Sequence, residues 1–304
     1  AMPASLFSRR VGRKAGFLCG TVLAAASGAA CTAAIYLESF WLLALGGLLF
    51  GFFAGFAQLY RFAVADVASE AFRPRAISLV LAGGVFAGLA GPQLADWGEH
   101  LISSQQFMGG FLFMIAVALL AALTLMLLSI PNLTKKQLEG PQRSLLEIMK
   151  QPVFIAAAVS ATIAQTVMNF LMTATPIAMI HICGHSFGSM TSVIGWHTVA
   201  MFAPGFFTGN LIKKFGEIKM ITAGLILEGA CIAIALAGIE VMNFWLAMFL
   251  LGVGWNFTFT ASTSLMTTAY TPAERGKTQG MMNQIIYTVV AIGSLSSGAF
   301  IHFF

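Results

Sequence analysis

The chain has 304 residues, of which 58% are apolar and only 9% are charged, and its mean hydropathy is +0.86. A soluble domain usually has about a quarter charged residues, whereas apolar runs of about 20 residues are long enough to cross a ~30 Å hydrocarbon core. The composition therefore indicates a polytopic, all-α membrane protein and excludes an ordinary soluble domain.

The basic residues are unevenly placed along the chain. All 16 Lys and Arg fall within five segments, at 9–14, 61–75, 135–150, 213–219 and 275–277. The connections near Glu38, Glu99, His181 and Glu240 contain no Lys or Arg. Alternation of basic and non-basic loops follows the positive-inside rule. The basic loops are therefore predicted to be cytoplasmic, and the net charge of +5 orients the protein rather than indicating a nucleic-acid partner.

Two stretches of the chain match each other at a fixed spacing. The basic segment 8–14 returns in weakened form at 210–219, and placing Gly12 on Gly216 gives a shift of 204 residues. The same shift places the Phe-Trp-Leu run that begins at Phe40 on the run that begins at Phe244. Two independent matches at one shift predict an internal repeat.

Taken in chain order, the apolar runs predict nine membrane-spanning helices. They are expected near 15–37, 39–62, 76–97, 108–130, 153–180, 189–211, 219–239, 242–268 and 278–304. The polar segment 131–152 is predicted to be a cytoplasmic linker between half-bundles at 1–130 and 153–304. Symmetry between the copies predicts twelve helices in all, with the first half lacking its first two helices and the second half its last. The chain is accordingly interpreted as an internal fragment.

The basic loop of the first copy resembles the loop signature of the major facilitator superfamily, Gly-x-x-x-Asp-Arg-x-Gly-Arg-Arg/Lys. Ser5 stands at the first Gly of the signature and Arg9 at its Asp. Residues that match its basic half are Arg10, Gly12, Arg13 and Lys14. In the second copy the matching residues are Gly209, Lys214 and Gly216.

This resemblance implies a pseudo-twofold helix bundle that carries out secondary transport, with no enzymatic activity and no cofactor. Gly91-Pro92 resembles a proline motif of antiporters, although Ala87 and Ala95 replace expected glycines. The run that begins with Gly254-Trp255 and the later Pro-Ala-Glu-Arg at 272–275 are similar to bacterial members that export drugs or import small metabolites.

Polar and aromatic residues inside the predicted spans are candidates for lining a substrate cavity near the bilayer midplane, where transporters of this type bind. Interhelical hydrogen bonding is the alternative for each of them. The candidates are Gln58, Gln165, Asn169, Trp196, His197, Trp255, Asn256 and Asn283.

Two groups are candidates for proton coupling. His197 titrates near neutral pH when unperturbed, although a histidine bonded to a neighbouring helix would serve structure alone. Glu228 is a carboxyl about nine residues into the span 219–239, and an ionisable residue within a membrane is a functional candidate by default. Structural pairing, or a protonated carboxyl with no coupling role, is the alternative.

The resemblance also implies a cytoplasmic latch. Asp66 lies at the cytoplasmic end of the second span and would pair with basic residues of the loop 9–14. The alternative is ordinary positive-inside charge with an incidental acid. Residues assigned to the latch and its motif are Arg10, Gly12, Arg13, Lys14, Asp66, Lys214 and Gly216.

The sequence thus predicts a monomeric transporter of the bacterial inner membrane that moves a small organic molecule by alternating access. Proton-coupled efflux is slightly favoured by Gly91-Pro92, and proton-coupled uptake of a metabolite or vitamin is the alternative. A membrane enzyme is disfavoured because catalytic motifs are absent, and a non-transporting membrane protein stays open. The four cysteines form no CxxC pair, so no metal site is predicted.

Overall fold

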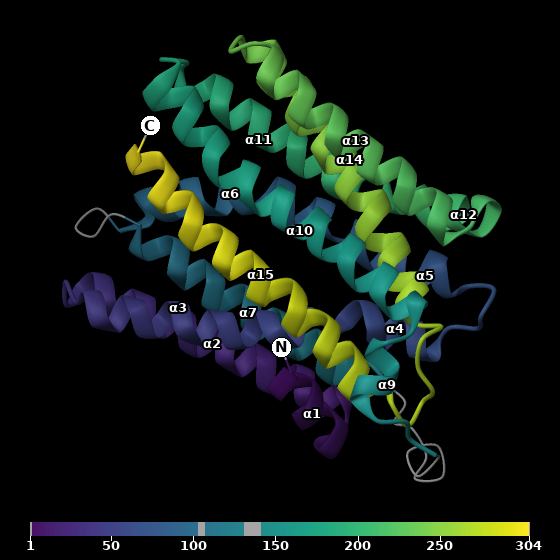
Figure 1. Ribbon diagram of the computed structural model, residues 1–304. Helices are drawn as coiled ribbons and strands as arrows, with labels where there is room; N and C mark the ends of the chain where they lie inside the picture. Colours follow the sequence, from purple (N-terminus) through teal and green to yellow (C-terminus); the bar gives the residue numbers. More distant parts are fainter. Residues whose placement is uncertain (1, 103–106, 131–140, 304) are drawn as a thin grey trace. The chain divides into compact units, whose positions relative to one another are not determined.

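The computed structural model describes residues 2–102, 107–130 and 141–303. Within these residues all regular structure is helical (Figure 1). Up to residue 130 the helices are α1 (Met2–Val11), α2 (Arg13–Tyr36), α3 (Phe40–Ala57), α4 (Tyr60–Val67), α5 (Arg73–Ala82), α6 (Gly84–Leu101) and α7 (Met108–Leu127). From residue 141 they are α9 (Leu145–Met149), α10 (Pro152–Ile177) with the π-helical turn η1 (Ala178–Ile182), α11 (Phe187–Phe202), α12 (Gly205–Phe215), α13 (Glu217–Ala237), α14 (Val241–Met266) and α15 (Arg275–Phe303).

Seven helices in the described part of the chain are long and apolar enough to cross a membrane. They correspond to seven of the nine predicted spans. The predicted span 189–211 is instead divided into α11 and α12, because Pro204 between them has no N–H to donate to a continuous helix. The last predicted span, 278–304, coincides with α15 as far as residue 303, and the first turns of α15 carry polar residues.

The predicted repeat has a counterpart in the backbone. Gly12 and Gly216 precede α2 and α13, and their φ and ψ angles are 92° and 156° at Gly12 and 87° and 159° at Gly216. Residues other than glycine rarely adopt this combination of φ and ψ angles. The order α1–α2–α3 in the first copy therefore returns as α12–α13–α14 in the second, with the same turn at the same place.

By its contacts the chain divides into two compact units. The first unit contains residues 1–63, 89–142 and 272–281, and the second contains 64–88, 143–271 and 282–304. In the first unit, α2 packs against both α3 and α7. Gly20 approaches Phe56 on α3, and Gly28 approaches Ile115 on α7, because neither glycine has a side chain to hold the neighbouring helix away.

The second unit is built around α14. This helix packs against α10, α11 and α13, and most of its residues from position 247 onward are buried. An apolar cluster on these helices includes Val193, Cys231, Met248 and Leu251. Because three helices surround it, α14 is the element that positions the candidate residues described next.

Candidate functional site

The C-terminal half of α14 carries a run of buried polar side chains. Asn256, Thr258, Thr260, Ser262 and Thr263 each have no exposed surface. A polar group buried in an apolar environment is costly unless it finds a partner, yet the hydroxyls of Thr258 and Thr260 have none among the described residues. Ser262, by contrast, shares a 2.7 Å hydrogen bond with Ser160 on α10.

Two predicted cavity residues from different helices meet on this run. The indole Nε1 of Trp255 on α14 donates to Oε1 of Gln165 on α10 at 3.0 Å. The Trp255 ring stacks on Phe259 with 4.8 Å between centroids and meets the edge of Phe202 on α11 at 5.9 Å. The pair therefore combines a flat aromatic surface with an amide group, although both side chains are buried.

Asn256 and His197 are held by hydrogen bonds to neighbouring helices. Asn256 donates from Nδ2 to the Met201 carbonyl at 2.8 Å and accepts from the Thr208 hydroxyl at 2.7 Å. The Nδ1–H of His197 donates to the Met248 carbonyl of α14 at 2.7 Å. These contacts are those expected of interhelical bonding, and a cavity role for either residue stays a prediction.

Trp196 is the most exposed of the predicted cavity residues, with half of its surface accessible. Its ring lies 6.2 Å from that of Trp245 on α14, and Trp245 stacks on Phe249 with centroids 5.2 Å apart and planes 6° from parallel. Trp245 and Phe249 were not among the residues predicted from the sequence, although they lie beside Trp196. The available signal was their spacing of four residues, which places two aromatic rings on one face of a helix.

The remaining cavity candidates belong to three different helices. Gln58 caps the end of α3 and is half-buried in the first unit. Asn169 on α10 is half-buried, and Asn283 on α15 is fully buried, both in the second unit.

Glu228 lies near the middle of α13 and is only 3% exposed. It faces α14 where Gly224 and Gly254 bring the two helix backbones together. Neither carboxyl oxygen has a hydrogen-bond partner among the described residues, and the Thr258 hydroxyl lies beside the carboxyl outside bonding geometry.

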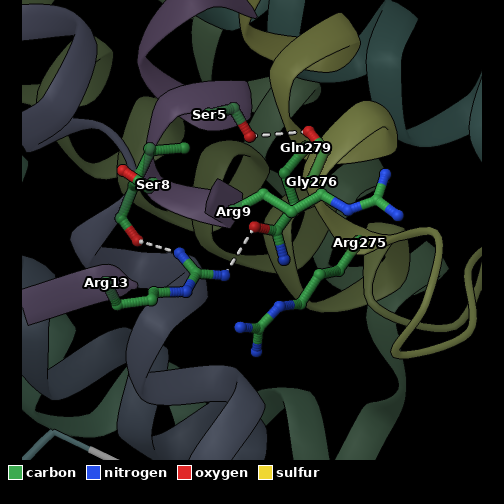
Figure 2. Close-up of a pocket in the computed structure, with 8 residues that line it drawn as sticks. Ser5, Ser8, Arg9, Arg13, Arg275, Gly276 and Gln279 are labelled. Atoms are coloured by element: carbon green, nitrogen blue, oxygen red, sulfur yellow. Dashed lines mark hydrogen bonds between the residues drawn. The ribbon is translucent and has the colours of Figure 1, made fainter. Parts of the chain in front are cut away.

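The first unit contains a cluster of basic and polar residues from the predicted loop motif (Figure 2). Arg13 donates from Nη2 to Oε1 of Gln279 at 2.8 Å, and the Ser5 hydroxyl donates to the Gly276 carbonyl at 2.6 Å. Figure 2 shows the side chain of Arg9 lying across Gly276. Gly276 has no side chain and so leaves room for that of Arg9. These contacts join α1 and the start of α2 to the first turns of α15.

Other motif residues have different surroundings. Arg10 is exposed, and Lys14 donates from Nζ to the carbonyls of Met126 and Leu128 at the end of α7, both at 2.8 Å. In the second copy, the exposed Lys214 lies 5.2 Å from the centre of the Phe215 ring. Asp66 is half-buried on α4 in the second unit.

Arg13 and Glu217 directly follow the matched glycines, and each makes a hydrogen bond in the same place of its repeat copy, although one is basic and the other acidic. Arg13 donates from Nη1 to the Leu59 carbonyl at 3.4 Å, and Glu217 accepts from the Ser264 hydroxyl at 3.0 Å. Both contacts join the first residue of one helix to the end of the next.

Among the residues that the structure describes, no three His, Cys, Asp or Glu side chains group together as metal ligands would.

The sequence matches the family model described as Major Facilitator Superfamily over residues 1–301. It is 41% identical over 304 residues to the riboflavin transporter RfnT of Brucella anthropi, covering 99% of this chain and 76% of that protein. It is also 31% identical to the uncharacterized MFS-type transporter YddS of Bacillus subtilis, covering 96% of this chain and 70% of that one.

Two solved structures share the fold at low sequence identity. The human organic anion transporter MFSD10 aligns with a TM-score of 0.74 at 14% identity, over 97% of this chain and 73% of that one. The fucose:proton symporter FucP of E. coli aligns with a TM-score of 0.63 at 15% identity, over 96% of this chain and 86% of that one.

Proposed function

Because the chain belongs to the Major Facilitator Superfamily, we propose that it carries riboflavin, or a closely related flat heteroaromatic vitamin, across the membrane into the cell. The observation that carries this proposal is the 41% identity to a riboflavin transporter over 99% of the chain. This relative favours the vitamin alternative over drug efflux, for which the sequence offered only Gly91-Pro92. A vitamin is useful to a cell once taken up, so we propose the inward direction.

The aromatic groups of the second unit suit a substrate of this shape. A fused three-ring flavin offers two flat faces and a polar edge, and aromatic side chains favour offset or edge-on contact with such faces. Trp196 is exposed and backed by Trp245 and Phe249. Amides such as Gln165 and Asn169 can both donate to and accept from a ring edge. We therefore propose Trp196 as an aromatic contact and the two amides as edge contacts.

We propose that transport is driven by protons, with Glu228 and His197 as the candidate coupling groups. Both are buried, and each has polar atoms without a hydrogen-bond partner within the described residues.

We further propose that the protein resides in a bacterial inner membrane as a monomer. We also propose that Asp66 acts as a latch with the loop that contains Arg10, Gly12, Arg13 and Lys14. Lys214 and Gly216 form the corresponding loop in the second copy.

The test is transport by the purified protein in lipid vesicles. An imposed inward proton gradient should drive riboflavin inward, and adding riboflavin should dissipate the gradient. Trp196→Ala should weaken riboflavin uptake about two- to tenfold, since a lost aromatic contact contributes roughly 0.5–1.5 kcal/mol beyond its buried area. Trp196→Phe keeps an aromatic face and serves as the matched control.

The outcomes separate the parts of the proposal. Outward riboflavin movement against the proton flow would identify an exporter and contradict the direction. Inward movement indifferent to the gradient would contradict proton coupling. No riboflavin transport, with a response to another small molecule, would contradict the substrate.

A further inference from the structure

Among the described residues, the helices that pack most closely on α13 bring no basic group beside Glu228. The helices packed against α13 are α14, α10 and α12. The sequences of α14 and α10 contain no charged or titratable residue, and α12 contributes only Lys213 and Lys214, which are exposed at its end next to Gly216. On α13 itself the neighbouring titratable group is the buried Cys231 thiol, while Glu217 and Lys219 lie in the first turn.

The internal repeat shows that helix packing alone does not require this carboxyl. At the shift of 204 residues, Glu228 corresponds to Ala24 on α2 and Gly224 corresponds to Gly20. Ala24 is 4% exposed, almost the same as Glu228, and α2 packs closely on α3 as α13 does on α14. The first copy therefore buries an apolar methyl group where the second copy buries an acid.

A charged carboxylate at this position would be expensive. Burial removes its water, and neither of its oxygens gains a hydrogen bond from the described residues in return. A neutral carboxylic acid avoids most of that cost. When α13 is packed on α14, the protonated form of Glu228 is therefore favoured. When water reaches the place where the two helices cross, at Gly224 and Gly254, release of the proton is favoured.

We propose that Glu228 is a proton-binding site that holds its proton while α13 is packed on α14 and releases it when water reaches the crossing at Gly224 and Gly254. Proton binding and helix packing are then linked, and each drives the other by the same free energy. The use of this proton to drive transport rests on the proposed function, but the site itself does not.

The first test measures the proton without any transport. In lipid nanodiscs, the infrared band of a protonated carboxylic acid should be present at neutral pH and absent from Glu228→Gln. Glu217→Gln is the matched control, because it makes the same change on the same helix at a carboxyl that already has a hydroxyl partner. The band should survive in Glu217→Gln. Its persistence in Glu228→Gln, or its absence from the unaltered protein, would overturn the proposal.

The second test uses unfolding in mixed micelles. If the folded protein binds one proton more than the unfolded protein, the equilibrium constant of unfolding rises about tenfold for each unit by which the pH rises. Glu228→Gln should lose this tenfold contribution, because its amide cannot release a proton. Glu217→Gln should keep the slope of the unaltered protein. Equal slopes in the unaltered protein and in Glu228→Gln would overturn the linkage.

A third measurement separates this proposal from the proposed function. If Glu228 supplies the coupling proton, Glu228→Gln should still exchange riboflavin between two equal pools but should no longer accumulate it under a pH gradient. Accumulation equal to that of the unaltered protein would overturn the coupling role. If the unaltered protein does not move riboflavin at all, the proposed function fails while the infrared and unfolding tests still judge the proton site.

Discussion

Gly12 and Gly216 hold backbone angles that other residues adopt only with strain. Replacing either by alanine should lower the free energy of unfolding by about 1–3 kcal/mol, the usual cost of placing a side chain in this region. Gly47→Ala is the control, since Gly47 lies within helix α3 and nothing approaches the place of its new methyl group within 4 Å. Unfolding in mixed micelles measures all three variants. Equal stability of Gly12→Ala and Gly47→Ala would show that the turn tolerates other residues.

At this scale the sequence supplies candidate residues but not their hydrogen-bond partners. Gln165 and Trp255 were both predicted as cavity residues, but they are 90 positions apart and nothing in the sequence shows that they share a hydrogen bond. His197 presents the same difficulty, because its partner is a backbone carbonyl of α14, which leaves no trace in residue type. Partners of this kind depend on how helices rotate about their axes, and side-chain type constrains that rotation weakly.

At the scale of elements, α4 and its Asp66 provide a test of the proposed latch. Asp66→Asn should reduce riboflavin transport up to about fivefold while membrane insertion stays normal, because an ion pair in contact with water contributes about 0–1 kcal/mol. Such a small energy is enough to bias an equilibrium that has to reverse in each cycle. Transport in vesicles and expression level are the two measurements. Glu70→Gln, a nearby exposed carboxyl, is the control, and an equal effect of both changes would contradict a latch.

Element types were easier to predict than element breaks. Seven predicted spans correspond to long apolar helices, because length and hydropathy decide whether a segment crosses a bilayer. Pro204 lies within the predicted span 189–211, yet whether a proline bends or ends a membrane helix depends on its neighbours. The π-helical turn η1, which directly follows α10 and its internal Pro176, has no hydrophobic signature of its own and could not be predicted.

For the whole molecule, the positions of the basic loops predict one orientation in the membrane. In a background without native cysteines, a cysteine at Lys150 should react with an impermeant maleimide only from the cytoplasmic side, and one at Glu240 only from the opposite side. The physical reason is that basic loops are retained in the cytoplasm during insertion. Labelling of both positions from the same side would contradict the predicted number of crossings between them, and reversed labelling would contradict the orientation.

The class of molecule was accessible from the sequence because composition and charge alternation indicate a polytopic membrane protein, and the basic loop motif resembles that of a transporter family. The substrate was not, since midspan amides and indoles suit many flat organic molecules. Proton-coupled efflux was preferred over vitamin uptake on one dipeptide, Gly91-Pro92, and the similarity to a riboflavin transporter favours the alternative. Substrate choice depends on the shape of a cavity, which a list of its candidate residues does not specify.

The matched turns at Gly12 and Gly216 separate the path of the chain from the interactions made beside it. The residue after the glycine is Arg13 in one copy and Glu217 in the other, opposite in charge and each with its own partner. The two glycines nevertheless hold nearly the same backbone angles. In this molecule one kind of bend therefore supports two different sets of interactions.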